Sequence, residues 1–320
     1  MKRWASLAML AVLLVAIPPH SAAAQDTARQ PGAVYDRDRP NEKLGPAPRR
    51  DISGTWEPAN GPGGGIQGKG ALSMESCKRE KSGKYAIDPN PPKWDTGYGT
   101  ADCLRPDVEP PYTDLGWETL KQHKPTEGYR MVPSGITNDP SPLLGCEPGG
   151  FPRIALHNFR TTEIEQTPTK VIFMYLFNHK WRVVWTDGRE LPPDPTNPTW
   201  NMPTPPEPRY WGYSAGKWVD DYTFVAQTDG FYYDKTWLDN AGLPHSDALV
   251  IEETYHRVDD KHLQMSIKIT DPKMYTRPWV AMDKLSMRLQ PSAFDIREME
   301  CSPSDSKAYQ DLVGNSYGDK

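Results

Sequence analysis

Hydrophobic and polar residues alternate along the C-terminal half of the chain, and this alternation predicts strands. In residues 261–270, KHLQMSIKIT, every second residue from Leu263 to Ile269 is apolar and its neighbours are polar. A period of two is typical of a strand with one face in the core and one face in water. Runs rich in β-branched and aromatic residues predict further strands at 169–178, 179–190, 222–231, 248–258 and 279–290.

Turn residues separate several of these runs. Asp187-Gly188 and Asp259-Asp260 are typical of tight turns and predict short connections between neighbouring strands. No comparable amphipathic helix is apparent, and we expect only one short helix, around 114–123. Consecutive strands with short turns predict an all-β fold: an antiparallel meander that either closes as a barrel or folds as a sandwich.

Gly54-Thr55-Trp56 refines this expectation. The triplet resembles the first-strand signature of lipocalin-like barrels, in which the Trp closes one end of the barrel and meets a basic residue from the last strand. Arg288 is the candidate for that basic residue. Alternatively, Trp56 fills the core of some other β fold. We therefore predict a lipocalin-like barrel.

The two ends of the chain and its proline content define the domain organisation. Lys2 and Arg3, an apolar run over 7–17 and Ala22-Ala23-Ala24 predict a signal peptide at 1–24, with a short membrane anchor as the alternative. Residues 25–50 are charged and proline-containing, which predicts a flexible leader. We expect a single β domain over 51–301, a Pro-rich elaboration of it at 61–145, and a flexible tail over 302–320.

Four cysteines follow the predicted signal peptide, and their even number in an exported chain predicts disulfides. Four cysteines allow three pairings, of which we favour Cys77 with Cys103 and Cys146 with Cys301. Zinc binding is the alternative, but no C-x-x-C or Cys/His spacing supports it. We expect no metal and no other cofactor.

Composition restricts the partners. The full chain has a net charge of −5 and no basic run, which argues against nucleic acid and against anionic membranes. No segment after the signal peptide is long and apolar enough to predict stable insertion in a membrane. The 11 Trp and 15 Tyr residues supply large apolar surfaces for a core or for a pocket that binds a small hydrophobic or aromatic molecule. The oligomeric state stays open.

Pro244-His245-Ser246-Asp247 is the first candidate for chemistry. If a strand begins early, His245 and Asp247 share a face, and the carboxylate would orient the imidazole as a general base. The same residues also have turn chemistry, because Ser and Asp side chains hydrogen-bond to nearby backbone amides. The sequence leaves both interpretations open.

A second set of candidates surrounds the turn at Asp187. Arg189 would either bind a ligand oxygen or pair with Asp187 at the surface. On the same alternation, His179, Trp181 and Trp185 would either line an aromatic cavity inside a barrel or pack on its outside. We add Trp218 and Tyr233 as aromatic ligand-binding candidates.

Glu253 shares a strand face with apolar residues, so burial would make it a candidate acid, although an exposed face is the alternative. GYSAG at 212–216 matches the G-x-S-x-G motif of serine hydrolases, but the context lacks the strand, sharp turn and helix that present the serine. We therefore interpret 212–218 as a hairpin turn, after which Trp218 enters the next strand.

Several stretches together resemble a large family of exported bacterial proteins, most of unassigned function. These stretches are DISGTW (51–56), CEPGGFPR (146–153), EQTPTKV (165–171), TDGR (186–189), GYSAGKW (212–218), DGFYYDKTWLDNAGLPHSD (229–247) and DPKMYTRPW (271–279). The chain departs from the family pattern at 219–222 and in the longer tract from 61 to 144. The resemblance implies an exported β-rich fold and nominates Arg153, Asp187, Arg189, His245 and Asp247 as motif residues, without implying a reaction.

Two main functions follow from these observations. The first is an enzyme that performs hydration, elimination, isomerisation or hydrolysis on a small hydrophobic or aromatic molecule at a barrel mouth. In it, His245 oriented by Asp247 would move the proton, with Arg153 and Arg189 holding negative charge. The second is a non-catalytic periplasmic or secreted binding protein for an apolar ligand. A structural envelope protein is a third alternative.

Overall fold

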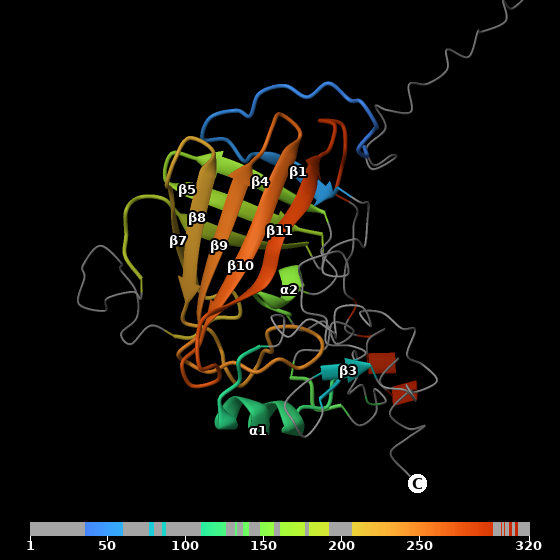
Figure 1. Cartoon of the computed structure of the whole chain (residues 1–320), viewed down its shortest axis with the longest axis vertical. Helices are drawn as coiled ribbons and strands as arrows, with labels where there is room; N and C mark the ends of the chain where they lie inside the picture. The colour runs from blue at the N-terminus through green and yellow to red at the C-terminus, as the bar shows by residue number, and fades with distance from the viewer. Residues whose placement is uncertain are drawn as a thin grey trace, which may run out of the picture.

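The computed structural model of the chain describes residues 36–59, 110–125, 137–140, 148–156, 161–176, 179–191 and 207–296, the backbone of 77–79 and 85–87, and a few isolated positions elsewhere. Within these residues the secondary structure is almost entirely β (Figure 1). The strands are β1 (Gly54–Pro58), β2 (Cys77–Arg79), β3 (Tyr85–Ile87), β4 (Thr162–Thr167), β5 (Lys170–Tyr175), β6 (Lys180–Trp185), β7 (Tyr213–Trp218), β8 (Thr223–Asp229), β9 (Val250–Arg257), β10 (His262–Thr270) and β11 (Trp279–Leu289). The helices are α1 (Asp114–Gln122) and α2 (Arg153–Leu156).

Nine of the described strands close into a barrel in the order β1-β11-β10-β9-β8-β7-β6-β5-β4, and β2 pairs with β3 apart from it. The expected all-β closed barrel is therefore confirmed, it is consistent with a lipocalin-like architecture, and the sandwich alternative is wrong. The short helix expected around 114–123 is α1, which Thr113 caps by accepting a hydrogen bond from the Gly116 amide.

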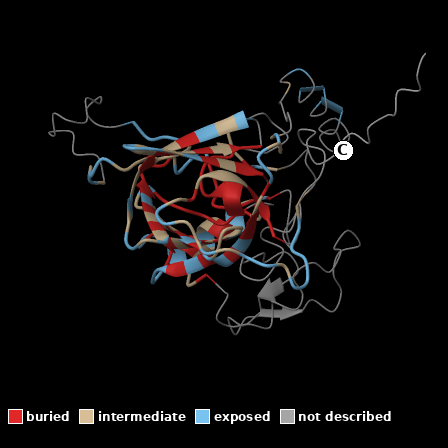
Figure 2. Cartoon of the chain, turned by 90° about the horizontal axis from the view of Figure 1, so that it is seen from above, coloured by how far each residue is buried: buried red, intermediate tan, exposed pale blue. Residues whose placement is uncertain are grey.

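Alternation along the strands places the core inside the barrel. Every second residue of β10 is buried, from Leu263 to Ile269, and the same alternation runs along β9 from Ile251. Seen from above, the strands form a ring, and many of their residues are buried (Figure 2). The prediction that residues 261–270 form a strand with one apolar and one polar face is thus confirmed, and the apolar face lies in the core.

The barrel wall has one irregular seam, between β6 and β7. These two strands run parallel, and only Val184 with Ser214 and Trp185 with Ala215 are in register. All the other neighbours in the barrel are antiparallel. Because β7 begins only at Tyr213, the first half of β6 faces residues 207–212, which are not part of β7. This seam positions the candidate site.

Trp56 of β1 is fully buried, and its indole donates a hydrogen bond to the Ile52 carbonyl at 3.0 Å. The basic residue over its ring is Arg257, whose guanidinium carbon lies 4.5 Å from the ring centroid. The expectation that Arg288 fills this role is wrong. Arg288 is in register with Glu57 and not with Trp56, so it lies on the opposite, outer face of the sheet.

The outer face at Arg288 is covered by the segment that precedes the barrel. Residues 36–50 run across the upper end of the barrel (Figure 1). Arg288 donates hydrogen bonds to Asp36, Asp38 and Glu42 at 2.7 to 3.1 Å, and its side chain is fully buried as a result. Composition predicted a flexible leader over 25–50, but residues 36–50 make specific contacts, because their carboxylates have a basic partner on β11.

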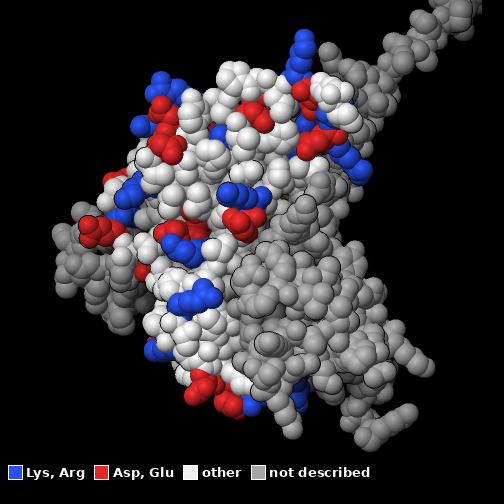
Figure 3. Space-filling model, in the orientation of Figure 1, with Lys and Arg blue, Asp and Glu red and all other residues white. Residues whose placement is uncertain are grey.

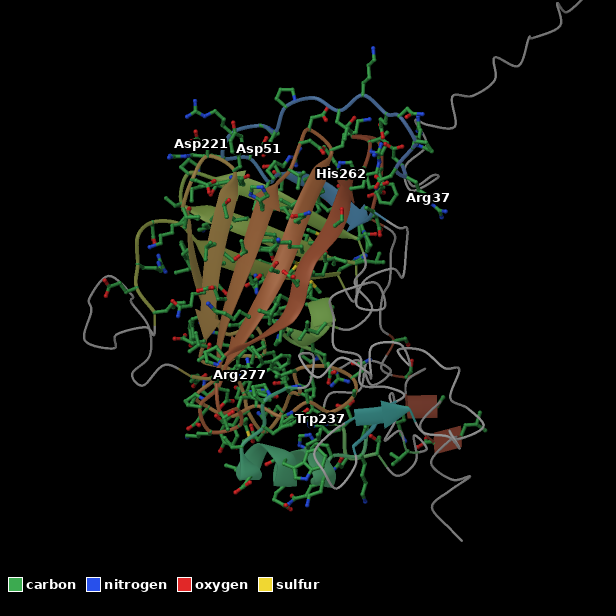
Figure 4. All side chains as sticks on the ribbon, in the orientation of Figure 1. Arg37, Asp51, Asp221, Trp237, His262 and Arg277 are labelled. Carbon is green, nitrogen blue, oxygen red and sulfur yellow. The ribbon has the colours of Figure 1, made fainter. Side chains whose placement is uncertain are left out.

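His262 belongs to the same network at the upper end of the barrel, where Figure 4 labels it. Its ring nitrogens lie 2.8 Å from carboxylate oxygens of Asp259 and Asp38. Burial alone would lower the pKa of His262, but the hydrogen bonds and charges of these two carboxylates raise it above its ordinary value. Asp259 also accepts hydrogen bonds from the Lys261 and His262 amides, which confirms the predicted turn between β9 and β10.

The lower end of the barrel is closed by loops and by α2. Residues 151–156 are all buried, and the Arg182 guanidinium of the barrel interior lies 3.9 Å from the Phe151 ring. Figure 1 shows α2 at this lower end, with α1 further below. Trp237, in the loop between β8 and β9, lies in this lower region (Figure 4). Long loops are therefore packed beneath the barrel and do not only cover its surface.

The prediction that residues 212–218 form a hairpin turn is wrong, because residues 213–218 are strand β7. The turn comes earlier, at Gly212, which has a φ of 62°. Ser214 lies within the strand and hydrogen-bonds to Thr228 of β8 at 2.9 Å, so it is not presented on a bend as in a hydrolase. The side chains of Cys77, Cys103, Cys146 and Cys301 lie outside the described residues, as do the predicted signal peptide and most of the 61–145 elaboration and of the tail.

Candidate functional site

The His245 motif forms a buried turn. Thr236 donates its hydroxyl hydrogen to the Tyr232 carbonyl at 2.8 Å, so the same oxygen accepts the Nε2–H of His245, also at 2.8 Å. Burial lowers the pKa of His245, against weaker opposing contributions from Ser246 and Asp271, and so favours the neutral imidazole. The ring therefore joins two loop segments.

Asp247 does not orient this imidazole. Its carboxylate is exposed and forms an ion pair with Lys273, which lowers the pKa of Asp247. The residue between them, Ser246, donates hydrogen bonds from its amide and its hydroxyl to Asp271 at 2.6 and 2.7 Å. The predicted pair of His245 with Asp247 is thus not formed, because the chain turns between them and does not continue as a strand.

Arg153 is also used within the fold. It donates hydrogen bonds to both carboxylate oxygens of Asp139, at 2.8 and 2.6 Å, and from Nε to Asn240 at 2.6 Å. The guanidinium is 1% exposed and lies 5.9 Å from the Trp237 ring centroid. This bidentate, buried contact ties α2 to two loops beneath the barrel.

Glu253 is fully buried inside the barrel, so the alternative of an exposed face is wrong for this residue. Its two oxygens accept hydrogen bonds from Nη2 of Arg182 at 2.9 and 2.7 Å, and Oε2 also accepts one from the Tyr255 hydroxyl at 2.7 Å. Arg182 comes from β6 and Glu253 from β9, so this ion pair spans the interior of the barrel. We call Arg182, Glu253, Tyr255 and the neighbouring Tyr175 the interior polar cluster.

Three polar groups in the interior polar cluster have no hydrogen-bond partner in the described part of the chain. Nε and Nη1 of Arg182 are buried and have no hydrogen-bond acceptor among the described residues, and the same holds for the hydroxyl of Tyr175. Burial raises the pKa of Tyr175, so its hydroxyl keeps its proton at neutral pH. Burial acts to lower the pKa of Arg182, but the Glu253 carboxylate more than offsets this and keeps the guanidinium charged. The cluster therefore offers hydrogen-bond donors that the described part of the chain does not use.

A pocket of about 610 Å³ lies at the seam between β6 and β7. Aromatic rings dominate its wall, with two arginines and a glutamate among them. Its lining residues are Trp181, Arg182, Val183, Trp185, Glu207, Pro208, Arg209, Tyr210, Trp211, Gly212, Tyr213, Ser214 and Tyr232. We call it the seam pocket. Its size is that of sites for small organic molecules.

Two of the lining residues, Arg182 and Ser214, belong to the inward face of the sheet, since Arg182 reaches Glu253 and Ser214 reaches Thr228. The seam pocket therefore extends to the level of the barrel wall, where β6 and β7 are in register at only two residue pairs. Trp211 lines the pocket and also stacks on Tyr175, with ring centroids 5.4 Å apart and planes 13° apart. Trp211 thus connects the pocket with the interior polar cluster.

The predicted face with Trp181 and Trp185 points outward, so these residues do not line the barrel interior. They nevertheless line the seam pocket, and the Trp181 side chain is 64% exposed. Arg189 stacks over Trp185 at 3.7 Å and forms an ion pair with Asp187 at 2.5 Å, which lowers the pKa of Asp187. The surface pairing considered for Asp187 and Arg189 is therefore the one observed. His179, at the start of this face, is exposed and has a φ of 44°.

The last two aromatic candidates lie elsewhere. Trp218 is on the inward face of β7, where its ring is 5.5 Å from that of Phe224. Tyr233 is 57% exposed and is not among the residues that line the seam pocket. Its neighbour in the sequence, Tyr232, does line the pocket.

Asp229, which the sequence did not single out, ends β8 directly opposite Tyr213 of the pocket wall. Burial raises the pKa of this carboxyl to about 6. Its Oδ1 is buried and has no hydrogen-bond partner among the described residues. A carboxyl group with a pKa near neutrality is suited to move a proton.

Sequence reasoning also missed Arg182, Tyr175 and Trp211. Arg182 alternates with Val184 on β6, so a charged residue on an otherwise apolar strand face was the available signal, as it was for Glu253. Trp211 gave no signal, because it lies in a Pro-rich connection without periodicity. Only the closure of the barrel brings these residues together.

No family model, curated protein or solved structure matches the chain. No helix among the described residues is long and apolar enough to cross a bilayer. In the same part of the chain, no group of three or more His, Cys, Asp or Glu residues has the arrangement of a metal site.

Proposed function

We propose that the protein is exported and binds a small aromatic or apolar molecule in the seam pocket. The observation that carries this proposal is the pocket itself, a concave site of about 610 Å³ whose wall includes three Trp and three Tyr side chains. Export rests on the signal-peptide pattern at 1–24.

The exposure of Trp181 supports this proposal. A Trp side chain that is 64% exposed keeps a large apolar surface in water, which a ligand would cover. Cationic groups hold other rings of the pocket in place, since Arg209 lies 4.2 Å from the Tyr213 ring centroid and Arg189 lies 3.7 Å from that of Trp185. A wall of fixed rings binds flat molecules with little loss of conformational entropy.

The face of the molecule shown in Figure 3 agrees with a small-molecule ligand better than with a polyanion. Basic and acidic side chains are interspersed over this face and form no continuous basic patch. Binding of nucleic acid relies on such a patch. We therefore propose a small molecule, and not a nucleic acid or a membrane surface, as the partner.

The test is a calorimetric screen of small aromatic compounds with the purified protein, repeated with Trp181→Ala. We expect the variant to bind the ligand about 10-fold more weakly, which corresponds to the loss of one ring contact. Tyr233→Ala is the matched control, because Tyr233 is similarly exposed, at 57% against 64% for Trp181, but is not among the residues that line the pocket. Equal weakening in both variants would contradict binding at the seam pocket.

An acid/base enzyme, a lyase, isomerase or hydrolase, is the second candidate, and Asp229 supports it. This carboxyl has a pKa of about 6 and lies opposite Tyr213, which lines the pocket. If a ligand from the screen is turned over, we expect Asp229→Asn to abolish turnover while binding persists. Turnover that is unchanged in Asp229→Asn would exclude Asp229 as the proton-transfer group.

A further inference from the structure

We infer that the ligand of the seam pocket carries an uncharged oxygen acceptor, such as a ketone or amide carbonyl, that hydrogen-bonds to Arg182 and Tyr175. This inference rests on the proposed function and names the chemical class of its ligand. It starts from three buried donor groups that have no acceptor among the described residues: Nε and Nη1 of Arg182 and the hydroxyl of Tyr175.

Buried donors of this kind are uncommon in folded proteins, because each unpaired group costs free energy. Both side chains are almost completely buried, with Arg182 3% and Tyr175 4% exposed. Glu253 binds only Nη2 of Arg182, so Nε and Nη1 are available to an oxygen of a ligand, since no described residue accepts a hydrogen bond from them. The position is next to the seam pocket, because Arg182 is one of the lining residues and Trp211 stacks on Tyr175.

The charges of the interior polar cluster favour an uncharged acceptor over a carboxylate. The positive charge of Arg182 is balanced by Glu253 at 2.7 Å, so a second carboxylate here would face a buried negative charge without a counterion of its own. At the pocket wall, Arg209 has Glu207 close by in sequence, and Arg189 is paired with Asp187. A carbonyl oxygen accepts hydrogen bonds from the same donors and brings no net charge.

The ring that bears the carbonyl would lie among the aromatic side chains of the wall. Trp211 lies between the pocket and the cluster, because it lines the pocket and its ring stacks on that of Tyr175. The rings of the wall thus recognise the frame of the ligand, and the donors of the cluster recognise its oxygen.

The experiment compares three compounds with one frame by isothermal titration calorimetry: 2-acetylnaphthalene, 2-isopropenylnaphthalene and 2-naphthoate. The first carries a ketone, the second replaces the ketone oxygen with a CH₂ group, and the third carries a carboxylate. For the native protein we expect the ketone to bind about 10-fold more tightly than the alkene, as a buried hydrogen bond provides, and more tightly than the carboxylate.

Tyr175→Phe separates recognition from folding. The variant removes a hydroxyl with no partner among the described residues and keeps the ring that stacks on Trp211, so we expect no loss of melting temperature. Its preference for the ketone over the alkene should fall about 3-fold or more. Tyr275→Phe is the control: Tyr275 is not part of the interior polar cluster, and the variant removes a buried hydrogen bond to the Pro244 carbonyl, so it should lower the melting temperature and keep the preference for the ketone.

Each result decides a different statement. If ketone and alkene bind equally, or if Tyr175→Phe keeps the full preference, the acceptor is not recognised by the cluster and the inference is wrong, while the seam pocket stands. Tighter binding of 2-naphthoate than of the ketone refutes the argument from charge. If none of the three compounds binds, the inference fails together with the seam pocket as a site for aromatic molecules of this size.

Discussion

Replacement of Glu253 by Gln tests whether the buried ion pair holds the barrel together. The carboxylate accepts two hydrogen bonds from Arg182, at 2.9 and 2.7 Å, and one from Tyr255 at 2.7 Å. Glu253→Gln keeps the size of the side chain but leaves the charge of Arg182 buried without a counterion, and it places an amide NH₂ group where donors already point.

The size of the effect follows from this geometry. Breaking a buried pair by removing one partner costs about 3–5 kcal/mol, because the remaining charge stays desolvated. Glu252→Gln is the matched control, at the residue of β9 that directly precedes Glu253. Its partner Lys268 lies at 2.5 Å, but both side chains are more than 40% exposed, so its loss should cost about 0–1 kcal/mol.

The assay is urea unfolding followed by tryptophan fluorescence, with the free energy of unfolding obtained by linear extrapolation. The double variant Arg182→Met with Glu253→Leu should recover most of the loss, because apolar side chains of similar volume need no counterion. If Glu253→Gln is no less stable than Glu252→Gln, the reasoning that the barrel interior is a low-dielectric site around Arg182 is refuted.

Three further predictions concern other regions. His262 has a raised pKa, so its charged form stabilises the fold below about pH 6.5, and this contribution should disappear as the pH rises through the folded-state pKa. The free energies of unfolding of the native protein and of His262→Gln should therefore converge at alkaline pH. A difference that stays constant with pH would contradict this. Gly116→Ala should destabilise the protein although Ala favours helices, because the new Cβ would lie 2.1 Å from the Met274 carbonyl oxygen; a raised melting temperature would show that α1 is not held in this position. Asp247→Asn should change the melting temperature by no more than about 2 °C, as expected of an exposed pair, whereas His245→Ala should lower it clearly by leaving a buried cavity; the opposite order would contradict the turn described here.

The sequence by itself determined the class of fold. Alternation such as that of residues 261–270 requires a sheet with one buried face, and the turn at Asp259 requires two adjacent strands, because these features depend on neighbours in the chain. Buried Trp56 and the inward carboxylate of Glu253 were also accessible from local pattern, since alternation assigns each residue of a strand to one of two faces.

Only the tertiary structure decided which residues meet. The local pattern left open whether Trp181 and Trp185 face inward or outward, and it paired His245 with Asp247 where a turn separates them. The contact of Arg182 with Glu253 joins residues 71 positions apart, and it depends on the closure of the barrel and on the parallel seam of β6 with β7. Strand periodicity specifies the face of a side chain but not its partner across the barrel, because that partner is set by strand order and register.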